Sequence, residues 1–191
     1  PTHPIGKVQT VEELLVKLKK AYDEGLIGDN DFYAKVLGYP LQRQLRVPPK
    51  FALENPSWQQ ITFTEGELVG SWAGVAVRSE AKGGPVGNLT TYPPAVIFTI
   101  NLGQSRALAP LAGPGAKKCI SPEQLREIWG PANYFPPADN IPPPHGPPSR
   151  LERYKSVING REHNADFNFG RFAPFCLWQF SVSESFSGKI K

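Results

Sequence analysis

A cysteine and a histidine are the residues of this chain that could most directly support covalent catalysis. Cys119 follows two lysines and precedes a predicted helix, a setting that makes a thiol more acidic. His163 lies on a later predicted strand, where papain-like and cell-wall peptidases often place their base. The helix begins only at 121–122, so Cys119 lies outside the first turn, where the helix dipole is strongest. A cysteine hydrolase, a peptidase or amidase using Cys119 and His163, is therefore the alternative function.

The second cysteine, Cys176, offers a different role for Cys119. The two residues either remain as buried thiols or form a disulfide between the start of a helix and the last strand. The bond would close a loop of about 57 residues and restrict the unfolded chain by roughly 4 kcal/mol. We favour the disulfide, which would place the protein in an oxidising compartment.

Residues for metal or nucleotide chemistry do not group in this sequence. His3, His145 and His163 are far apart, and none shows a metal-ligand spacing such as i, i+4 with a carboxylate. The glycine-rich stretch AGPGAKK, residues 112–118, lacks the spacing and the Ser or Thr of a phosphate-binding loop. We therefore expect no metal site and no cofactor.

The stretch PANYFPPADNIPPPHGPPS, residues 131–149, holds eight prolines together with aromatic and polar side chains. So many fixed φ angles and missing N–H donors exclude a helix interior or a central strand, so we expect an extended surface loop. Long ordered loops are usually functional, and proline lowers the entropy cost of presenting a fixed surface. The candidate partner-binding residues are Tyr134, Phe135, Asp139, Asn140 and His145. The alternative is a loop packed back on its own sheet through its two aromatic residues.

Helices precede strands in the first half of the chain. Apolar residues at helical spacing, a capping box from Thr10 to Glu13 and a stop at Gly25 predict a first helix. A second, shorter helix is predicted over 29–38. Two strands are then predicted within 61–78, on either side of Glu65-Gly66, and a third over 94–102.

The second half repeats this order. Ser121 and Gln124 predict a capping box for a helix over 121–129, which ends at Gly130. The dipeptide at 159–160, Asn-Gly, predicts a hairpin, because it is the most favoured type I′ turn. The closing strand, FCLWQFSVS, alternates so that Trp178, Phe180 and Val182 share a face.

The motifs LGYP (37–40) and IWGP (128–131) end the helices of the two halves in the same way. With the order of elements, they resemble the fold shared by the secreted β-lactamase-inhibitor proteins and the small outer-membrane-assembly lipoproteins. That resemblance implies a helix pair on a small antiparallel sheet, and binding and inhibition rather than catalysis. We predict an α+β protein with an N-terminal extension (1–9) and two related helix-plus-antiparallel-sheet halves (10–110 and 111–191), whose strands can join in one continuous sheet.

Composition excludes some classes of function. The chain has 191 residues, 40% hydrophobic and 20% charged, which is ordinary for a soluble globular protein. Its apolar runs fall short of the roughly 20 residues of a membrane-spanning helix. The net charge of +4 suits an acidic partner, but the basic residues are scattered and do not alternate with aromatic residues, so we expect no nucleic-acid binding.

These observations favour an exported protein-binding module, periplasmic or secreted, with an enzyme or toxin as its partner. We expect an inhibitor or immunity-type protein that blocks this partner through its long proline-rich loops. A weaker alternative rests on the Gly-x-Trp sequence at Trp72, which is similar to the entrance motif of lipocalin-like barrels and implies an apolar-ligand carrier. Such barrels need eight strands in a continuous meander, more than the sequence predicts.

Overall fold

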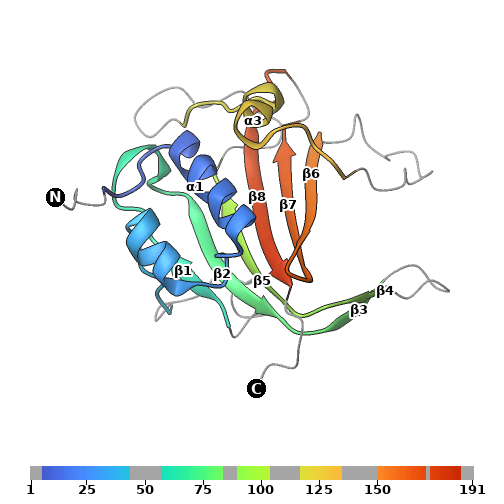
Figure 1. Cartoon of the computed structure of the whole chain (residues 1–191). Coiled ribbons are helices and arrows are strands. Elements are labelled where there is room, and N and C mark those ends of the chain that lie inside the picture. Colours follow the sequence, from blue (N-terminus) through green and yellow to red (C-terminus); the bar gives the residue numbers. More distant parts are fainter. Residues whose placement is uncertain are drawn as a thin grey trace.

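Helices and one large antiparallel sheet make up the described part of the chain (Figure 1). The computed structural model describes residues 6–43, 57–83, 90–103, 117–134, 150–170 and 173–185. In chain order its elements are α1 (Val11–Glu24), the π-helix η1 (Phe32–Leu37), β1 (Gln59–Ile61), the 3-10 helix η2 (Gly66–Leu68), β2 (Trp72–Arg78), β3 (Ala81–Gly83), β4 (Thr90–Tyr92), β5 (Ala95–Asn101), α3 (Pro122–Trp129), β6 (Leu151–Ile158), β7 (Arg161–Phe169) and β8 (Leu177–Ser185). The predicted α+β class is confirmed.

Local hydrogen bonds determine where α1 and α3 begin and end. The Thr10 side chain accepts a hydrogen bond from the backbone N–H of Glu13, and Gly25 ends α1 in the left-handed region at φ 71°. At α3, Ser121 Oγ accepts the N–H of Gln124, while the Gln124 side chain accepts the N–H of Ser121. The predicted capping box of Ser121 and Gln124 is confirmed. At α1 only the Thr10 half of the predicted box is present, because Glu13 Oε2 accepts the N–H of Gln9 at 3.0 Å and not that of Thr10. The short helix predicted before Gly38 is present as η1.

One continuous sheet joins the two halves of the chain. The described strands pair antiparallel in the order β1-β2-β5-β8-β7-β6. β5 comes from the first half and pairs with β8 from the second, which places Phe98 opposite Val182. β3 and β4 form a two-stranded ribbon that extends from the ends of β2 and β5 (Figure 1). The two predicted halves therefore share a single sheet.

The described helices cover one face of this sheet (Figure 1). Side chains alternate between the two faces along each strand, and one set of alternate residues joins the helices in a single hydrophobic core. This set includes Val96, Phe98 and Ile100 on β5 and Phe180 and Val182 on β8. The other set lies on the face that is turned away from α1, η1 and α3, which we call the outer face.

An aromatic cluster attaches α3 to α1 and to the sheet. The Trp129 ring lies 5.3 Å from Tyr22, 5.4 Å from Tyr154 and 4.8 Å from Phe167, measured between centroids. Its indole N–H donates to the carbonyl of Leu15 on α1 at 3.1 Å. Trp129 is 4% exposed, so its ring links α3 to α1, β6 and β7 inside the core.

The connection between the first two strands differs from the prediction. A turn at Glu65-Gly66 was expected, and this part of the chain instead forms η2 between β1 and β2. Gly66 has φ +73°, and a Cβ there would lie 2.3 Å from the carbonyl oxygen of Gln9. The close approach of these two backbone segments replaces a tight hairpin with a longer connection.

Trp178 also departs from its predicted position. The pairing of β7 with β8 shifts between Asn168 and Phe169, so that Phe169 lies opposite Leu177 and Asn168 opposite Gln179. Trp178 is the extra residue at this bulge. Leu177 is buried in the core instead, while Trp178 is only partly buried.

Candidate functional site

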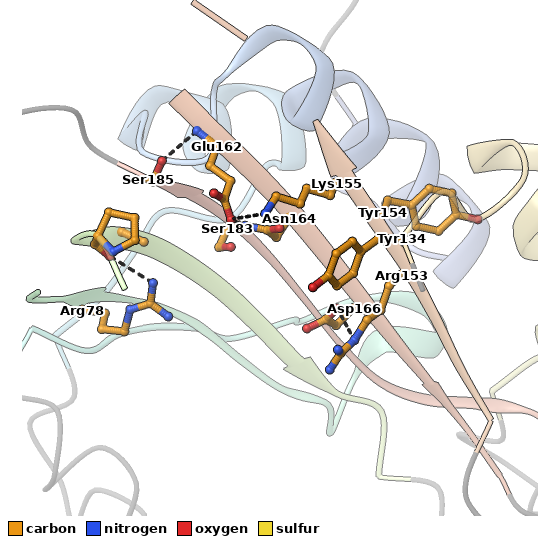
Figure 2. Close-up of a pocket in the computed structure, with 12 residues that line it drawn as sticks. Arg78, Tyr134, Arg153, Tyr154, Lys155, Glu162, Asn164, Asp166, Ser183 and Ser185 are labelled. Atoms are coloured by element: carbon orange, nitrogen blue, oxygen red, sulfur yellow. Dashed lines mark hydrogen bonds and ion pairs between the residues drawn. The ribbon is translucent and has the colours of Figure 1, made fainter. Parts of the chain in front are cut away.

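A cavity of about 510 Å³ lies on the outer face of the sheet (Figure 2). Five strands contribute to it: Arg78 comes from β2, Ala95 from β5, Ser183 from β8 and Asn164 from β7, and β6 closes one side. Most of its side chains are polar because they occupy the strand positions that alternate with the buried core. This volume falls in the range of ordinary ligand sites.

Two ion pairs join β6 to β7 within the cavity. Arg153 lies opposite Asp166 in the strand register, and its Nε is 3.1 Å from Asp166 Oδ1. The Lys155 ammonium lies 3.2 Å from Glu162 Oε1. These four side chains therefore form two neighbouring ion pairs with no net charge on the β6 and β7 side of the cavity (Figure 2).

Hydrogen bonds hold the Glu162 carboxylate in place. The Asn164 side chain donates to Glu162 Oε1 at 3.0 Å, and the Glu162 backbone N–H donates to Ser185 Oγ at 2.7 Å. The hydrogen bond from Asn164 is the main reason that the pKa of Glu162 lies below its ordinary value, with Lys155 and Arg78 adding to the effect. Glu162 is thus held as a carboxylate.

Asp166 has the opposite electrostatic environment. Burial raises the pKa of its carboxyl, and the charge of Arg153 only partly opposes this effect. At the far side of the cavity, the Arg78 guanidinium donates to the carbonyl of Pro93 at 3.0 Å. The cavity thus contains two carboxylates of unequal acidity, Glu162 and Asp166. Arg78 lies at one end of the cavity, and Arg153 and Lys155 lie at the other.

Tyr134 is the sequence-predicted partner-binding residue that the structure describes, and it lines this cavity. It is 38% exposed, and the Lys155 ammonium lies 5.5 Å from the centre of its ring.

The N–H groups of Asn133 and Tyr134 both point to the carbonyl of Arg153 at 3.2 Å. Asn133 also binds Lys155, accepting its N–H at 2.8 Å and donating to its carbonyl at 3.0 Å. These bonds attach the segment after α3 to the outer edge of β6. The remaining candidates, Phe135, Asp139, Asn140 and His145, lie outside the described residues.

Arg150 is attached to the same region of the sheet. Its carbonyl accepts the N–H of Phe169 at 2.9 Å, and its guanidinium lies 3.6 Å from Glu152 and 3.8 Å from Glu123. Glu152 is buried and also pairs with Arg126 of α3. Residues 134 and 150, which lie on either side of the prolines at 136–148 in the sequence, are thus both anchored beside β6.

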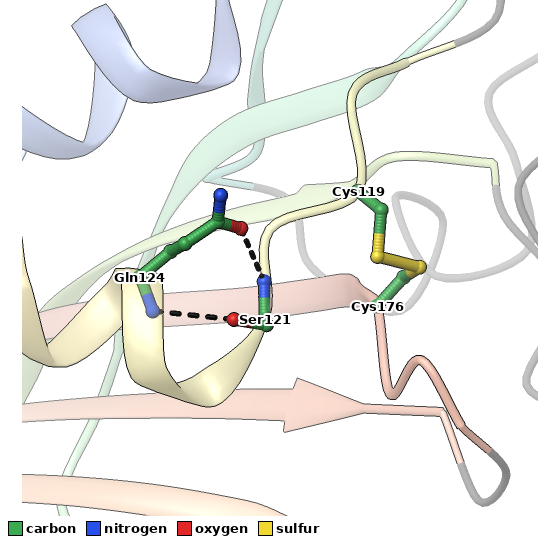
Figure 3. The surroundings of a disulfide bond; sticks show 4 residues. All are labelled: Cys119, Ser121, Gln124 and Cys176. Carbon is green, nitrogen blue, oxygen red and sulfur yellow. Dashed lines mark hydrogen bonds between the residues drawn. A yellow bond between two sulfur atoms is a disulfide. The ribbon is translucent and has the colours of Figure 1, made fainter.

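The structure joins Cys119 and Cys176 in a disulfide, with their Cα atoms 4.9 Å apart (Figure 3). The predicted bond is confirmed, and it lies next to the capping box of α3. An oxidised Cys119 has no thiol to act as a nucleophile. The structure therefore contradicts the free thiol that the hydrolase alternative requires.

His163 is placed far from the disulfide. Cys176 directly precedes β8, whereas His163 pairs with Glu184 near the other end of that strand. Seven residues of strand separate Leu177 from Glu184, which corresponds to roughly 23 Å. His163 is 1% exposed, and its Nδ1 lies 2.7 Å from the carbonyl oxygen of Tyr22. A carbonyl accepts hydrogen bonds only, so Nδ1 carries the proton and His163 attaches α1 to the sheet.

Trp72 packs against another tryptophan on the outer face of β2. Its ring stacks on Trp58, with centroids 4.5 Å apart and planes 10° from parallel. Gly74 makes this packing possible, since a Cβ there would lie 2.3 Å from the Trp58 ring. The described strands form an open sheet with β1 and β6 at its edges, not the closed barrel of the carrier alternative.

The sequence analysis did not identify the charged residues of the cavity. The signal was present in REHNADFNF, where Glu162, Asn164 and Asp166 occupy alternate positions of one strand. Such alternation shows that polar residues share a face, but not which strands lie beside them. Across the described ranges, no group of three or more His, Cys, Asp or Glu side chains could hold a metal ion.

Comparisons with protein family models, curated proteins and solved structures found no match to this chain. No helix in the described part of the chain is both long and apolar enough to cross a membrane. The function of the cavity is therefore inferred from the residues that line it.

Proposed function

We propose that this chain is an exported protein-binding module that blocks a partner enzyme or toxin, as an inhibitor or immunity protein does. Its contact surface comprises the proline-rich segment and the adjoining part of the outer face. The candidate contacts are Tyr134, Phe135, Asp139, Asn140 and His145. The resemblance to the β-lactamase-inhibitor fold implies the same class of function.

The observation that carries this proposal is the attachment of both flanks of the proline-rich segment to one edge of the sheet. Asn133 and Tyr134 bind the backbone of β6, and Arg150 binds β7 and the Glu152 carboxylate. A segment with fixed ends loses less conformational entropy when a partner binds it. Proline reduces this cost further, because its φ angle is already restricted.

Tyr134 has the character of an interface residue. Tyrosine is enriched among the residues that dominate binding energy, because a rigid ring is joined to a hydrogen-bonding hydroxyl. Tyr134 is exposed at the rim of the polar cavity, next to Lys155. A partner that covers this ring would therefore also reach the charged side chains of β6.

The disulfide supports the exported location. Such bonds persist in oxidising compartments and are rare in reducing ones, where thiols are kept reduced. The bond between Cys119 and Cys176 closes a loop of sequence separation 57.

Site-specific photo-crosslinking in extract of the source organism tests the proposal. A crosslinking amino acid in place of Tyr134 should give one discrete product, whose protein component is identified by mass spectrometry. The matched control carries the same group in place of Val16, which is 56% exposed on α1 in the helical layer. The purified partner should lose activity when the parent protein is added, and about tenfold more of the Tyr134→Ala or Asp139→Ala variant should be needed, as for other interface hot spots. Equal crosslinking from both positions, or a partner whose activity is unaffected, would contradict the proposal.

A further inference from the structure

Most of the charges of the outer-face cavity are already paired with one another. Arg153 pairs with Asp166 and Lys155 pairs with Glu162, so four of the charged side chains that line it form two ion pairs. A charged ligand would have to separate one of these pairs and leave a partly buried charge without a partner. That loss is costly in a site with limited solvent. The cavity is therefore better suited to an uncharged polar ligand.

Both ion pairs leave further hydrogen-bonding capacity. The closest contacts of the two ion pairs are to Oδ1 of Asp166 and Oε1 of Glu162, and each carboxylate has further lone pairs that can accept a hydrogen bond from a ligand hydroxyl. Arg153 pairs through Nε, which leaves its terminal nitrogens as donors. Ser183 can both donate and accept. Donors and acceptors are thus mixed over a short distance.

A hydroxyl group matches this mixture because it also donates one hydrogen bond and accepts others. Several hydroxyls on one rigid ring can satisfy neighbouring donors and acceptors at little entropy cost. Tyr134 adds an aromatic surface at the rim, against which the C–H face of such a ring can pack. The volume of about 510 Å³ is of the size that accommodates small ligands.

We propose that the outer-face cavity between Arg78 and Tyr134 binds an uncharged sugar. Asp166 and Glu162 accept hydrogen bonds from its hydroxyls, Arg153 and Ser183 donate to its oxygens, and Tyr134 packs against one face of the ring. The sugar site shares Tyr134 with the proposed partner-binding surface, but sugar binding does not depend on inhibition.

Titration of the isotope-labelled protein with neutral disaccharides, followed by amide NMR, tests this assignment. The probes are cellobiose, maltose and N,N′-diacetylchitobiose, and potassium glutamate serves as the charged comparison. At least one disaccharide should shift the amides of Arg153, Asn164 and Asp166 in a saturable manner, with no comparable shift from glutamate. The assignment is overturned if no disaccharide shifts these amides, or if glutamate shifts them equally.

Matched asparagine variants separate binding at the cavity from a general effect on the sheet. Asn164→Ala removes a residue that lines the cavity, whereas Asn168→Ala removes the same side chain from the same strand outside the lining. Asn164→Ala releases the Glu162 carboxylate that accepts from the sugar and should weaken sugar binding, whereas Asn168→Ala should leave it unchanged. Loss of one hydrogen bond of about 1.4 kcal/mol, as in Ser183→Ala, corresponds to about tenfold weaker binding. Ser183→Ala provides a second cavity variant, and equal sugar binding by all three variants and the parent would overturn the assignment. The crosslinking of a protein partner at Tyr134 is measured without sugar, so either proposal can fail while the other stands.

Discussion

Replacing Asn133 with alanine should expose the backbone of Lys155 to exchange with solvent. Lys155 lies on β6, at the edge of the described sheet, and its N–H points away from β7. An outward-facing amide on an edge strand is normally unprotected. Here the Asn133 side chain accepts this N–H at 2.8 Å and donates to the Lys155 carbonyl at 3.0 Å. One side-chain amide thus supplies the two bonds that a further strand would provide.

The size of the effect follows from those two bonds. Each hydrogen bond contributes a net of about 0.5–1.5 kcal/mol, and exposed bonds fall toward the lower end of that range. Losing both costs about 1.4 kcal/mol of local stability, which is a factor of about ten in an opening equilibrium. In Asn133→Ala the Lys155 amide should therefore exchange about tenfold faster. The amide of Tyr154 should be unaffected, because alternate residues of β6 point toward β7.

Hydrogen–deuterium exchange read residue by residue by NMR measures this difference. Ser57→Ala is the matched control, because Ser57 Oγ holds the N–H of Val77 at 2.8 Å and contacts its carbonyl at 3.2 Å on a different strand. That variant should accelerate exchange at Val77 and leave Lys155 protected. An unchanged exchange rate of the Lys155 amide in Asn133→Ala would refute the conclusion that the Asn133 side chain protects this edge of the sheet.

Four further predictions concern stability. In the native protein neither Cys119 nor Cys176 should react with a thiol reagent, and replacing both with alanine should lower the free energy of unfolding by about 4 kcal/mol in urea denaturation; labelling of two thiols would contradict this. Trp129→Ala should cost about 3–5 kcal/mol in the same assay because it removes a buried ring, and an unchanged midpoint would show that the core is misplaced. Glu162→Gln should destabilise the protein more at pH 7 than at pH 3, since a lowered folded pKa gives stability that is fully present above the unfolded pKa, about 4.3, and is lost as the pH falls through the folded pKa. Asp166→Asn should show the opposite pH dependence. Its stability relative to the parent protein should be greater at pH 7 than at pH 3, because burial raises the folded pKa of Asp166 above the unfolded value, about 3.9. Parallel pH dependence in these last two variants would refute the assigned environments.

Local sequence determined the helix ends and one hairpin. The capping box of Ser121 and Gln124 needs residues three positions apart, and the turn at Asn159-Gly160 needs two residues that tolerate positive φ, which both have at 51° and 74°. The disulfide could also be predicted, because two cysteines allow a single pairing. In each case the required interaction lies within a few residues, or no alternative partner exists.

Other features depended on contacts between distant segments. The pairing of β5 with β8 brings Phe98 opposite Val182, although most of the second half of the chain lies between these two residues in the sequence. The bulge that displaces Trp178 depends on how β7 and β8 fit together, so alternation within β8 alone predicted the wrong face for this residue.

The cavity shows the same division between local and tertiary information. The alternating polar residues Glu162, Asn164 and Asp166 are visible in the sequence of β7, but their partners Arg153 and Lys155 come from β6. Turn and cap preferences act through backbone bonds between near neighbours, so the sequence alone determined them. Strand order is decided by which apolar faces can be buried together beneath the helices, and the polar residues of the outer face are brought together as a consequence of that burial.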